Sequence, residues 1–350
     1  MNSYQVIDYG VPLKSVTLPM PKPTGSEVLI RVRAAGVCHS DLHIWEGGYD
    51  LGEGRRLSLK DRGLQLPLTM GHETAGEIVA IGPDVKDRKL GEICLAYPWI
   101  GCGECRVCRM GYENHCMKPK CLGVHRDGGY SDHMLVPHSH YLLPLDGLDP
   151  IALAPYACSG LTTYAALKKF GSAIIEEPVL VIGAGGLGLM CVTILKAMGG
   201  KGAVVVDIDE RRRAAAIEAG ALAAVDGGAA DSAAQVATAL GGPAWQVIDL
   251  VGSPATAKLG FNALAKGGKL IMVGLFGGSA PWSLPLIPMK AANIEGSYTG
   301  SLGELKELLE LVRSGKVAAI PIARRPMSDA TATLEDLRHG RVVGRVVMTP

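Results

Sequence analysis

The chain has 350 residues, a net charge of +1 and 48% hydrophobic residues. This length excludes a single small module and allows two or three folding units. The near-zero charge gives no general attraction to nucleic acid or to a membrane surface, so the expected partner is a small molecule. The first ten residues lack the pattern of a secretory signal, and the cytoplasm is therefore the expected compartment.

The first 150 residues predict a β-rich domain. Gly and Pro are frequent there, and short β-rich runs such as 27–37 (EVLIRVRAAGV) and 75–82 (AGEIVAIG) alternate with turns. Short strands at such spacing are typical of an antiparallel, barrel-like domain.

Strands and helices alternate after residue 177, which predicts a doubly wound parallel sheet. The predicted segments are the strands 178–183, 202–208, 246–252 and 268–275, and the helices that end at 198 and span 210–220. The uncharged run 178–195 is long enough to cross a membrane, but four glycines break it into a strand, a turn and a helix.

A last helix and a last strand close the chain. Ser301 and Glu304 form a capping box, leucines recur at helical spacing, and Gly315 stops the helix. The run 340–350 (GRVVGRVVMTP) then predicts a strand that rejoins the first domain.

A glycine-rich turn joins the first strand of the parallel sheet to its helix. Gly183, Gly185 and Gly188 form the pattern Gly-x-Gly-x-x-Gly. Such glycines permit a tight turn, the close approach of a pyrophosphate, and close packing of the helix on the strand. The pattern predicts a dinucleotide site.

Asp207 ends the next strand, where a carboxylate accepts hydrogen bonds from the adenosine ribose. A fixed carboxylate there favours NAD and repels the 2′-phosphate of NADP. Asp207 therefore predicts NAD, although the neighbouring Arg211 or Arg212 would hold a 2′-phosphate if Asp207 turned away.

Four of the nine cysteines lie in one glycine-punctuated loop: Cys102, Cys105, Cys108 and Cys116. In a reducing compartment such a cluster predicts a metal site, and four thiolates suit a closed, structural zinc site. An iron–sulfur cluster is the alternative, but its usual run places the fourth cysteine three residues on and before Pro. Cys121 is either a substitute ligand or a small buried residue.

Two further fragments carry side chains that bind metals. One is GVCHSDLH at 36–43, and the other is GHETAGEIVAIG at 71–82. With the cysteine loop, CSGLTTYAAL, GAGGLG and VVVD, they occur in the order typical of the zinc-dependent medium-chain alcohol dehydrogenases, which the chain resembles over nearly its whole length.

The resemblance implies a catalytic zinc bound by Cys38, His72 and Cys158. Three protein ligands leave one position for the oxygen of an alcohol, whose carbon gives hydride to a nicotinamide. The implied product is an aldehyde or a ketone, and the reaction is reversible.

The resemblance also implies a proton relay through Ser40 and His43. It gives Asp41 the role of orienting a ligand histidine, and it places Glu73 behind the zinc.

The resemblance places His39 and Arg345 at the cofactor pyrophosphate and Thr162 near the nicotinamide. The other implied cofactor positions are Gly186, Leu187, Arg212 and Val273. With NAD as cofactor, two zinc ions per subunit are expected, one catalytic and one structural.

The implied architecture is a GroES-like, barrel-type catalytic domain over 1–159, completed by 299–350, around a Rossmann domain over 160–298. A homotetramer or a homodimer is the expected assembly. A polyol or sugar-alcohol dehydrogenase of the same superfamily is an alternative, but it often uses a carboxylate ligand and lacks the full cysteine loop. A zinc-ribbon binding module is a second alternative and would need a basic face around that loop.

The segment 44–70 is longer than is usual for the family. Loops beside a fixed chemistry commonly set the shape of the substrate, so Trp45, Tyr49 and Leu57 are candidates for the pocket wall or its lid. A solvent loop or a subunit contact is an equal alternative.

Overall fold

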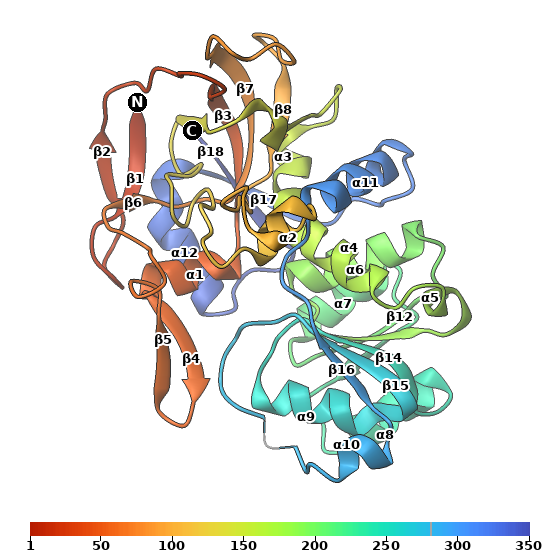
Figure 1. The fold of residues 1–350 in the computed structure, drawn as a ribbon. Coiled ribbons are helices and arrows are strands. Elements are labelled where there is room, and N and C mark those ends of the chain that lie inside the picture. The colour runs from red at the N-terminus through yellow and green to blue at the C-terminus, as the bar shows by residue number, and fades with distance from the viewer. Residues whose placement is uncertain (281) are drawn as a thin grey trace.

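The computed structural model describes residues 1–280 and 282–350, and its first part is a sheet shared by both ends of the chain (Figure 1). The strand order is β10–β8–β7–β3–β18–β17, and β9 also pairs with β3. The strands are β3 (Val28–Val37), β7 (Glu73–Ile81), β8 (Ile93–Ala96), β9 (His133–Val136), β10 (Leu142–Pro144), β17 (Ile322–Pro326) and β18 (Arg345–Thr349).

The middle of strand β3 has one exposed face, whereas both ends of the strand are buried on both faces. Ile30 and Val32 are at most 2% exposed, and Arg31 and Arg33 are exposed to solvent. This alternation follows from the two-residue period of a strand.

The C-terminal strand returns to the first sheet, as the sequence predicts. Strand β18 pairs antiparallel with β3, with Val347 opposite Gly36, and β17 continues the sheet in parallel with β18. A smaller sheet of order β2–β1–β6 packs nearby, from β1 (Asn2–Val6), β2 (Lys14–Thr17) and β6 (Leu68–Thr69).

The second part is a six-stranded parallel sheet of order β13–β12–β11–β14–β15–β16, which is the doubly wound dinucleotide-binding order. Its strands are β11 (Val179–Ile182), β12 (Ala203–Asp207), β13 (Ala223–Asp226), β14 (Ala244–Asp249), β15 (Leu264–Met272) and β16 (Asn293–Gly296). The predicted parallel sheet is confirmed, with β13 and β16 added at its edges.

Helices cover both faces of this sheet because its central strands are apolar throughout. Val179 and Val181 join the core that holds α6 (Gly186–Ala197), whereas Leu180 and Ile182 join the core on the other face. That second core includes residues of α8 (Ser232–Leu240) and α9 (Pro254–Ala263). Figure 1 shows α8 and α9 below the sheet and α6 above it.

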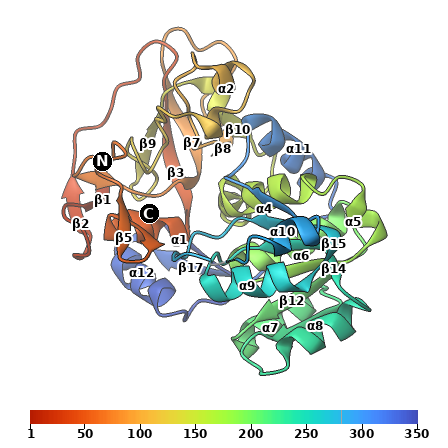
Figure 2. The ribbon, with the colours of Figure 1, turned by 60° about the horizontal axis from the view of Figure 1, so that its bottom comes forward.

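Two helices join the parts. Helix α4 (Ser159–Lys168) packs on α6, and α11 (Leu302–Arg313) packs on α4. Figure 2 shows α11 near β10 at the edge of the first sheet, and the Arg313 guanidinium of α11 donates to the Pro144 carbonyl of β10. The predicted capping box of α11 is present, with the Ser301 hydroxyl accepting from the Glu304 N–H at 3.2 Å.

The long segment after Cys38 begins with helix α1 (His39–Glu46) and continues as a hairpin of β4 (Gly48–Gly52) and β5 (Arg55–Ser58). Its tip reaches the parallel-sheet part, where the Gly278 N–H donates to the Asp50 carbonyl at 3.1 Å. The hairpin is therefore folded against the neighbouring part and is not a free solvent loop.

Trp45 does not line a pocket, so that expectation is wrong. The side chain is 1% exposed, and its indole N–H donates to the Val11 carbonyl at 2.5 Å. The Arg338 guanidinium lies 4.3 Å from the ring centroid. Trp45 is a core residue that fixes α1 against α12 (Ala330–Arg338).

Candidate active site and metal centres

Helix α1 starts at the end of β3 and fixes Cys38 there. Cys38 is the N-cap residue, and its backbone N–H donates to the Asp41 carboxylate at 2.9 Å. This bond satisfies a donor that the first turn leaves free, and it orients both side chains at one end of the sheet.

The structure brings Cys38, His72 and Cys158 together, with Glu73 beside them. Each offers one ligand atom, all lie within 4.8 Å of one another, and all four residues are buried. The Cys38 and Cys158 sulfurs are 3.9 Å apart. Two thiolates bound tetrahedrally at about 2.3 Å from one zinc would be about 3.8 Å apart, so the sulfur pair fits a shared ion.

His72 has a nitrogen available for such an ion. Its Nε2 is buried and has no hydrogen-bond partner among the described residues. A buried polar atom without a partner is costly, and metal coordination would satisfy it.

Asp41 lies behind His72, with its Oδ1 3.1 Å from Nδ1. The other carboxylate oxygen accepts the Tyr130 hydroxyl at 2.9 Å. Although burial opposes it, Asp41 raises the pKa of His72 well above its usual value. A carboxylate behind a ligand imidazole fixes the orientation of the ring and increases its basicity. Tyr130 carries no motif, and the sequence analysis missed it.

Glu73 and Arg345 form a buried ion pair next to Cys38, His72 and Cys158. The carboxylate contacts the Arg345 guanidinium and also accepts the Ser159 N–H at 3.3 Å. Burial raises the pKa of Glu73 to about 7, with Arg345 opposing the rise. Gly36 lies opposite Glu73, and a Cβ at Gly36 would come 2.1 Å from the Glu73 carboxylate.

Arg345 links the two predicted sites. Its guanidinium contacts Glu73, while a Cβ added to Gly186 would lie 2.2 Å from the Arg345 Cδ. The side chain therefore passes across the start of α6, at the glycine-rich turn.

Ser40 and His43 are on α1, three residues apart. His43 is 7% exposed, and its Nε2 has no partner among the described residues. Its ring packs 4.4 Å from Tyr49 and 5.4 Å from His39. Burial lowers the pKa of His43 to about 4, so the imidazole is neutral at neutral pH and can accept a proton.

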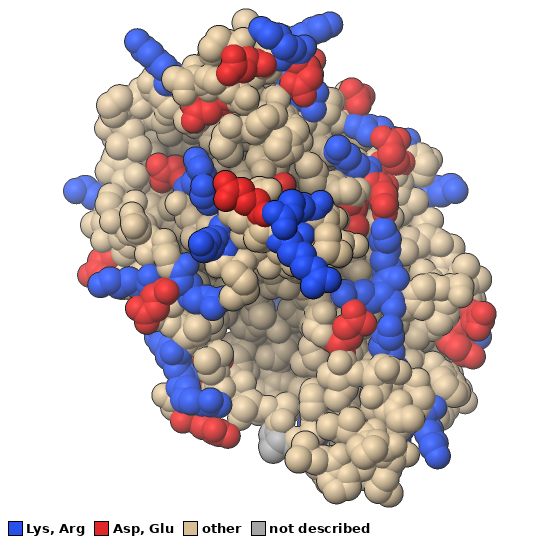
Figure 3. Space-filling view, in the orientation of Figure 1, with Lys and Arg blue, Asp and Glu red and all other residues tan. Residues whose placement is uncertain are grey.

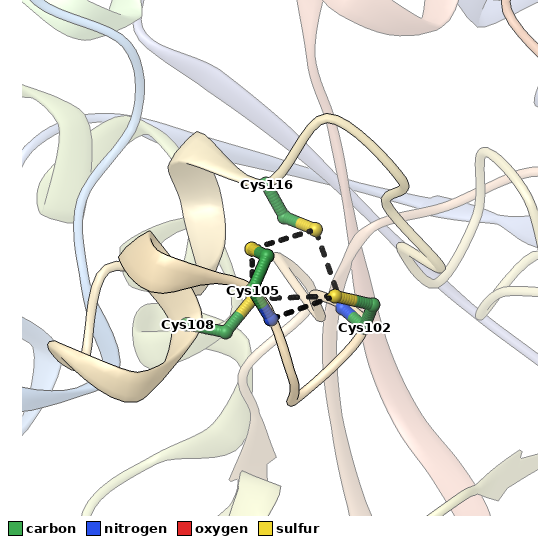
Figure 4. A group of neighbouring side chains, drawn as sticks. All are labelled: Cys102, Cys105, Cys108 and Cys116. Atoms are coloured by element: carbon green, nitrogen blue, oxygen red, sulfur yellow. Dashed lines mark hydrogen bonds between the residues drawn. The ribbon is translucent and has the colours of Figure 1, made fainter.

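The four cysteines of the loop converge as well (Figure 4). The Cys105 sulfur lies 3.4 Å from Cys108 and 3.8 Å from Cys116, and Cys102 lies 4.0 Å from Cys108. These separations leave room for one ion and not for a cluster with several irons and sulfides. They bracket the value of about 3.8 Å that tetrahedral zinc requires.

Backbone N–H groups support these thiols. The Cys102 N–H and the Lys118 N–H both donate to the Cys116 sulfur at 3.3 Å. Backbone N–H groups of Glu104 and Cys105 lower the pKa of Cys102 to about 6. Cys121 lies outside the cluster, buried and 3.8 Å from the Ile100 carbonyl, so it is a buried residue and not a fifth ligand.

The glycine-rich turn joins β11 to α6. Gly183 has φ +99°, which only glycine adopts readily. A Cβ at Gly188 would lie 2.0 Å from the Gly183 carbonyl, so the third glycine lets the helix pack on the turn. Gly185, Gly186 and Leu187 complete the turn and the first residues of α6.

Asp207 lies at the end of β12, directly beside this turn. Its carboxylate accepts the Ala184 N–H at 2.7 Å and the Asp209 N–H at 2.9 Å. A carboxylate has about four acceptor positions, so it can also accept ribose hydroxyls.

Arg211 and Arg212, the two arginines considered for a 2′-phosphate, both have partners within the chain. Arg211 forms a salt bridge of 2.7 Å with Asp209, and Arg212 donates to the Gly340 carbonyl at 3.1 Å. Burial lowers the pKa of His39, with Cys38 and Glu46 opposing the change and Arg212 and Arg345 adding to it.

Thr162 and Val273 are the remaining predicted cofactor residues. Thr162 is buried on α4, and its hydroxyl has no partner in the described chain. Val273 directly follows β15, and its N–H donates to the Asp249 carbonyl at 2.9 Å.

Aromatic side chains surround the Cys38–His72–Cys158 group, and the sequence analysis named only Tyr49. The Trp99 ring lies 5.3 Å from His72 and 6.3 Å from Tyr298. Trp99 precedes the cysteine loop by three residues, which is the only signal that could have identified it. Figure 3 shows a hollow below the centre of this face, with an uncharged floor and Lys and Arg at its rim.

Two protein-family models match the chain. The alcohol dehydrogenase GroES-like domain matches residues 24–147, and the zinc-binding dehydrogenase domain matches residues 186–314. No helix among residues 1–280 and 282–350 is long and apolar enough to span a bilayer.

Individual relatives match along the whole chain. An NAD-dependent alcohol dehydrogenase of Sulfurisphaera tokodaii is 38% identical, with 100% of both chains covered. A D-arabinose 1-dehydrogenase (NADP(+)) of Saccharolobus solfataricus is 35% identical over 98% of this chain and 95% of its own. The crystal structure of an alcohol dehydrogenase from Aeropyrum pernix superposes with a TM-score of 0.90 at 29% identity, and all of both chains is covered.

Proposed function

Because the chain belongs to the zinc-dependent medium-chain alcohol dehydrogenase family, we propose that it is an NAD-dependent alcohol dehydrogenase. The reaction is the reversible oxidation of a primary or secondary alcohol to an aldehyde or ketone. The observation that carries the proposal is the buried group of Cys38, His72 and Cys158, whose ligand atoms lie close together. Arg345 connects this group to the glycine-rich turn, because its side chain contacts Glu73 and passes Gly186.

The donor sets fit two zinc ions, one held by Cys38, His72 and Cys158 and one by the four loop cysteines. When bound, zinc supplies a Lewis acid for the substrate oxygen, and NAD supplies the hydride acceptor. Support for NAD comes from Asp207 at the end of β12, whose carboxylate is held beside the glycine-rich turn, and from the salt bridge of Arg211 with Asp209.

The chain's own residues orient the groups and move the proton. Asp41 fixes the orientation of the His72 ring. The buried Glu73–Arg345 ion pair lies beside the three ligand residues. Ser40 receives the proton of the alcohol and passes it to the neutral His43, which carries it outward. His39, Arg212 and Arg345 supply positive charge for the pyrophosphate.

A sugar or polyol dehydrogenase is the second candidate. The observation in its favour is the D-arabinose 1-dehydrogenase among the relatives. Two observations favour an alcohol: Cys158 offers a third ligand atom while the nearby Glu73 carboxylate is paired with Arg345, and the four-cysteine loop is complete.

We propose the domain division 1–159 with 299–350 around 160–298, because the first sheet contains β17 and β18 while the parallel sheet begins with β11. We also propose a cytoplasmic homotetramer or homodimer. Gel filtration with light scattering measures the assembly.

The test follows NADH formation at 340 nm with the purified, zinc-analysed protein against aliphatic, aromatic and secondary alcohols and D-arabinose. We expect turnover of alcohols with NAD, slower turnover with NADP, and about two zinc ions per chain. Turnover of the sugar alone would favour the second candidate. No NADH from any substrate in a protein with full zinc would overturn the proposal.

A further inference from the structure

We propose that Asn114 in the four-cysteine loop positions Tyr298 as a wall of the substrate pocket, and that this wall selects alcohols with a ring or a branched apolar group. The inference rests on the proposed dehydrogenase function. It assigns Asn114 as a positioning residue that acts through Tyr298.

Asn114 reaches across the molecule to the segment that leads from the parallel sheet back to the first part. It lies in the short helix η1 (Glu113–His115) and is 8% exposed. Its side-chain N–H donates to the Tyr298 carbonyl at 3.0 Å. This hydrogen bond joins the loop to a residue 184 positions away in the sequence.

A second hydrogen bond holds the same segment from the other side. The Tyr97 hydroxyl donates to the Gly300 carbonyl at 2.9 Å. Between the two held carbonyls lies Thr299, a buried residue with φ +50°. A non-glycine residue in the left-handed region costs about 1 kcal/mol or more and persists only where its surroundings hold it. The two side chains provide that constraint.

The constrained segment determines where the Tyr298 ring lies. The ring is 6.3 Å from Trp99, which is 5.3 Å from His72. Tyr298 is 52% exposed, so part of the ring is open to a bound molecule.

The position of the ring sets the substrate class. The aromatic neighbour of Tyr298 is the Trp99 ring, which in turn packs on His72, so we expect an alcohol of two or three carbons at the metal group to stop short of Tyr298. A benzyl or branched group does extend that far, and it gains apolar contact there.

Asn114 is not needed to hold the cysteine loop itself. Glu113 performs that task, because its carboxylate accepts the Gly101 N–H and the Tyr141 hydroxyl, both at 2.8 Å. The backbone N–H groups that donate to the Cys102 and Cys116 sulfurs belong to Cys102, Cys105 and Lys118. The Asn114 side chain is therefore free to serve the Tyr298 segment.

The test uses the zinc-loaded enzyme with Asn114→Asp, which keeps the shape of the side chain but replaces the N–H donor with an oxygen. We expect KM for benzyl alcohol to rise about tenfold relative to KM for ethanol, with zinc content unchanged. Asn262→Asp makes the same charge change on an exposed residue of α9 and is the matched control. Equal KM changes for both alcohols, or none, would overturn the proposal.

A double-mutant cycle distinguishes positioning from a general structural effect. If Asn114 acts through Tyr298, Asn114→Asp has no further effect on the KM ratio once Tyr298→Ala is present. Independent, additive effects would contradict the inference. If Asn114→Asp folds poorly, Asn114→Ala is used in the same cycle. A wild-type protein that oxidises neither alcohol disproves the proposed function, whereas an active wild type with an unchanged Asn114 variant disproves only this inference.

Discussion

The two cysteine-rich groups of this protein are built in opposite ways. The loop group takes all four sulfurs from residues 102–116, and two of them are only partly buried. The second group takes its atoms from positions 38, 72 and 158, each at most 5% exposed. A local spacing therefore suffices for a closed, supporting site, whereas a reactive site that excludes water has to be assembled by the whole fold.

Loss of a ligand in the assembled group gives the largest expected effect. Cys38→Ser should lower kcat more than about a thousandfold, because it removes the electrophile that stabilises the substrate oxygen. Zinc content should fall from two to one per chain, and NAD binding should persist. Steady-state kinetics measures kcat, metal analysis measures the zinc content, and NAD titration measures cofactor binding.

The matched control is Cys94→Ser, which makes the same change at a buried cysteine of β8. It should keep both zinc ions and normal kcat. Normal turnover of Cys38→Ser would contradict the proposal that Cys38, His72 and Cys158 form the catalytic zinc site.

A ligand change in the loop should instead affect stability. Cys105→Ser should remove one zinc and lower the free energy of unfolding by about 4 kcal/mol, because the thiols then lack their shared ion. Saturating turnover of ethanol should stay within about twofold, since the loop supplies no atom to the assembled group. Denaturant unfolding and metal analysis test this prediction, with Cys191→Ala in α6 as the control. If Cys105→Ser lost turnover but kept its stability, the loop site would be the catalytic one and not the structural one.

The residue behind the assembled group gives a smaller effect. Asp41→Asn removes the charge 3.1 Å from the His72 Nδ1. We expect zinc affinity at that group to fall about 10–100-fold, because such carboxylates fix the ligand ring. Competition with a chelator measures the affinity of each group. An equal loss at both groups would show a general effect on folding.

The same contrast explains what the sequence could predict. The cysteine spacing, the glycine-rich turn and the strand–helix alternation depend on neighbouring residues, and the structure contains each of them. The triad Cys38, His72 and Cys158 followed only from family resemblance, because no local rule joins positions so far apart.

Contacts between distant segments explain what was missed. Tyr130 reaches Asp41, and Asn114 reaches Tyr298, through hydrogen bonds that span 89 and 184 positions. Trp45 was misjudged for the same reason, since its partner Arg338 comes from the last helix. Neither kind of contact leaves a periodic pattern in the sequence.

The smallest expected effect concerns His43, which lies beside the assembled group. Burial lowers its pKa from the usual 6.5 to about 4, so between these values the unfolded chain binds a proton that the folded chain does not. Stability must therefore fall as the pH falls through this range. The loss from this one imidazole is about 1 kcal/mol at about pH 6.

His43→Gln should remove that part of the acid destabilisation, so that the difference in unfolding free energy between about pH 8 and about pH 6 shrinks by about 1 kcal/mol. Urea unfolding at the two pH values measures the difference, with His115→Gln as control. His115 is an exposed histidine of the loop. A shift for His115→Gln and none for His43→Gln would mean that the pH dependence belongs to the loop. The expected result assigns this part of the pH dependence to the buried group, because burial favours the neutral form of a histidine and the proton is therefore lost on folding.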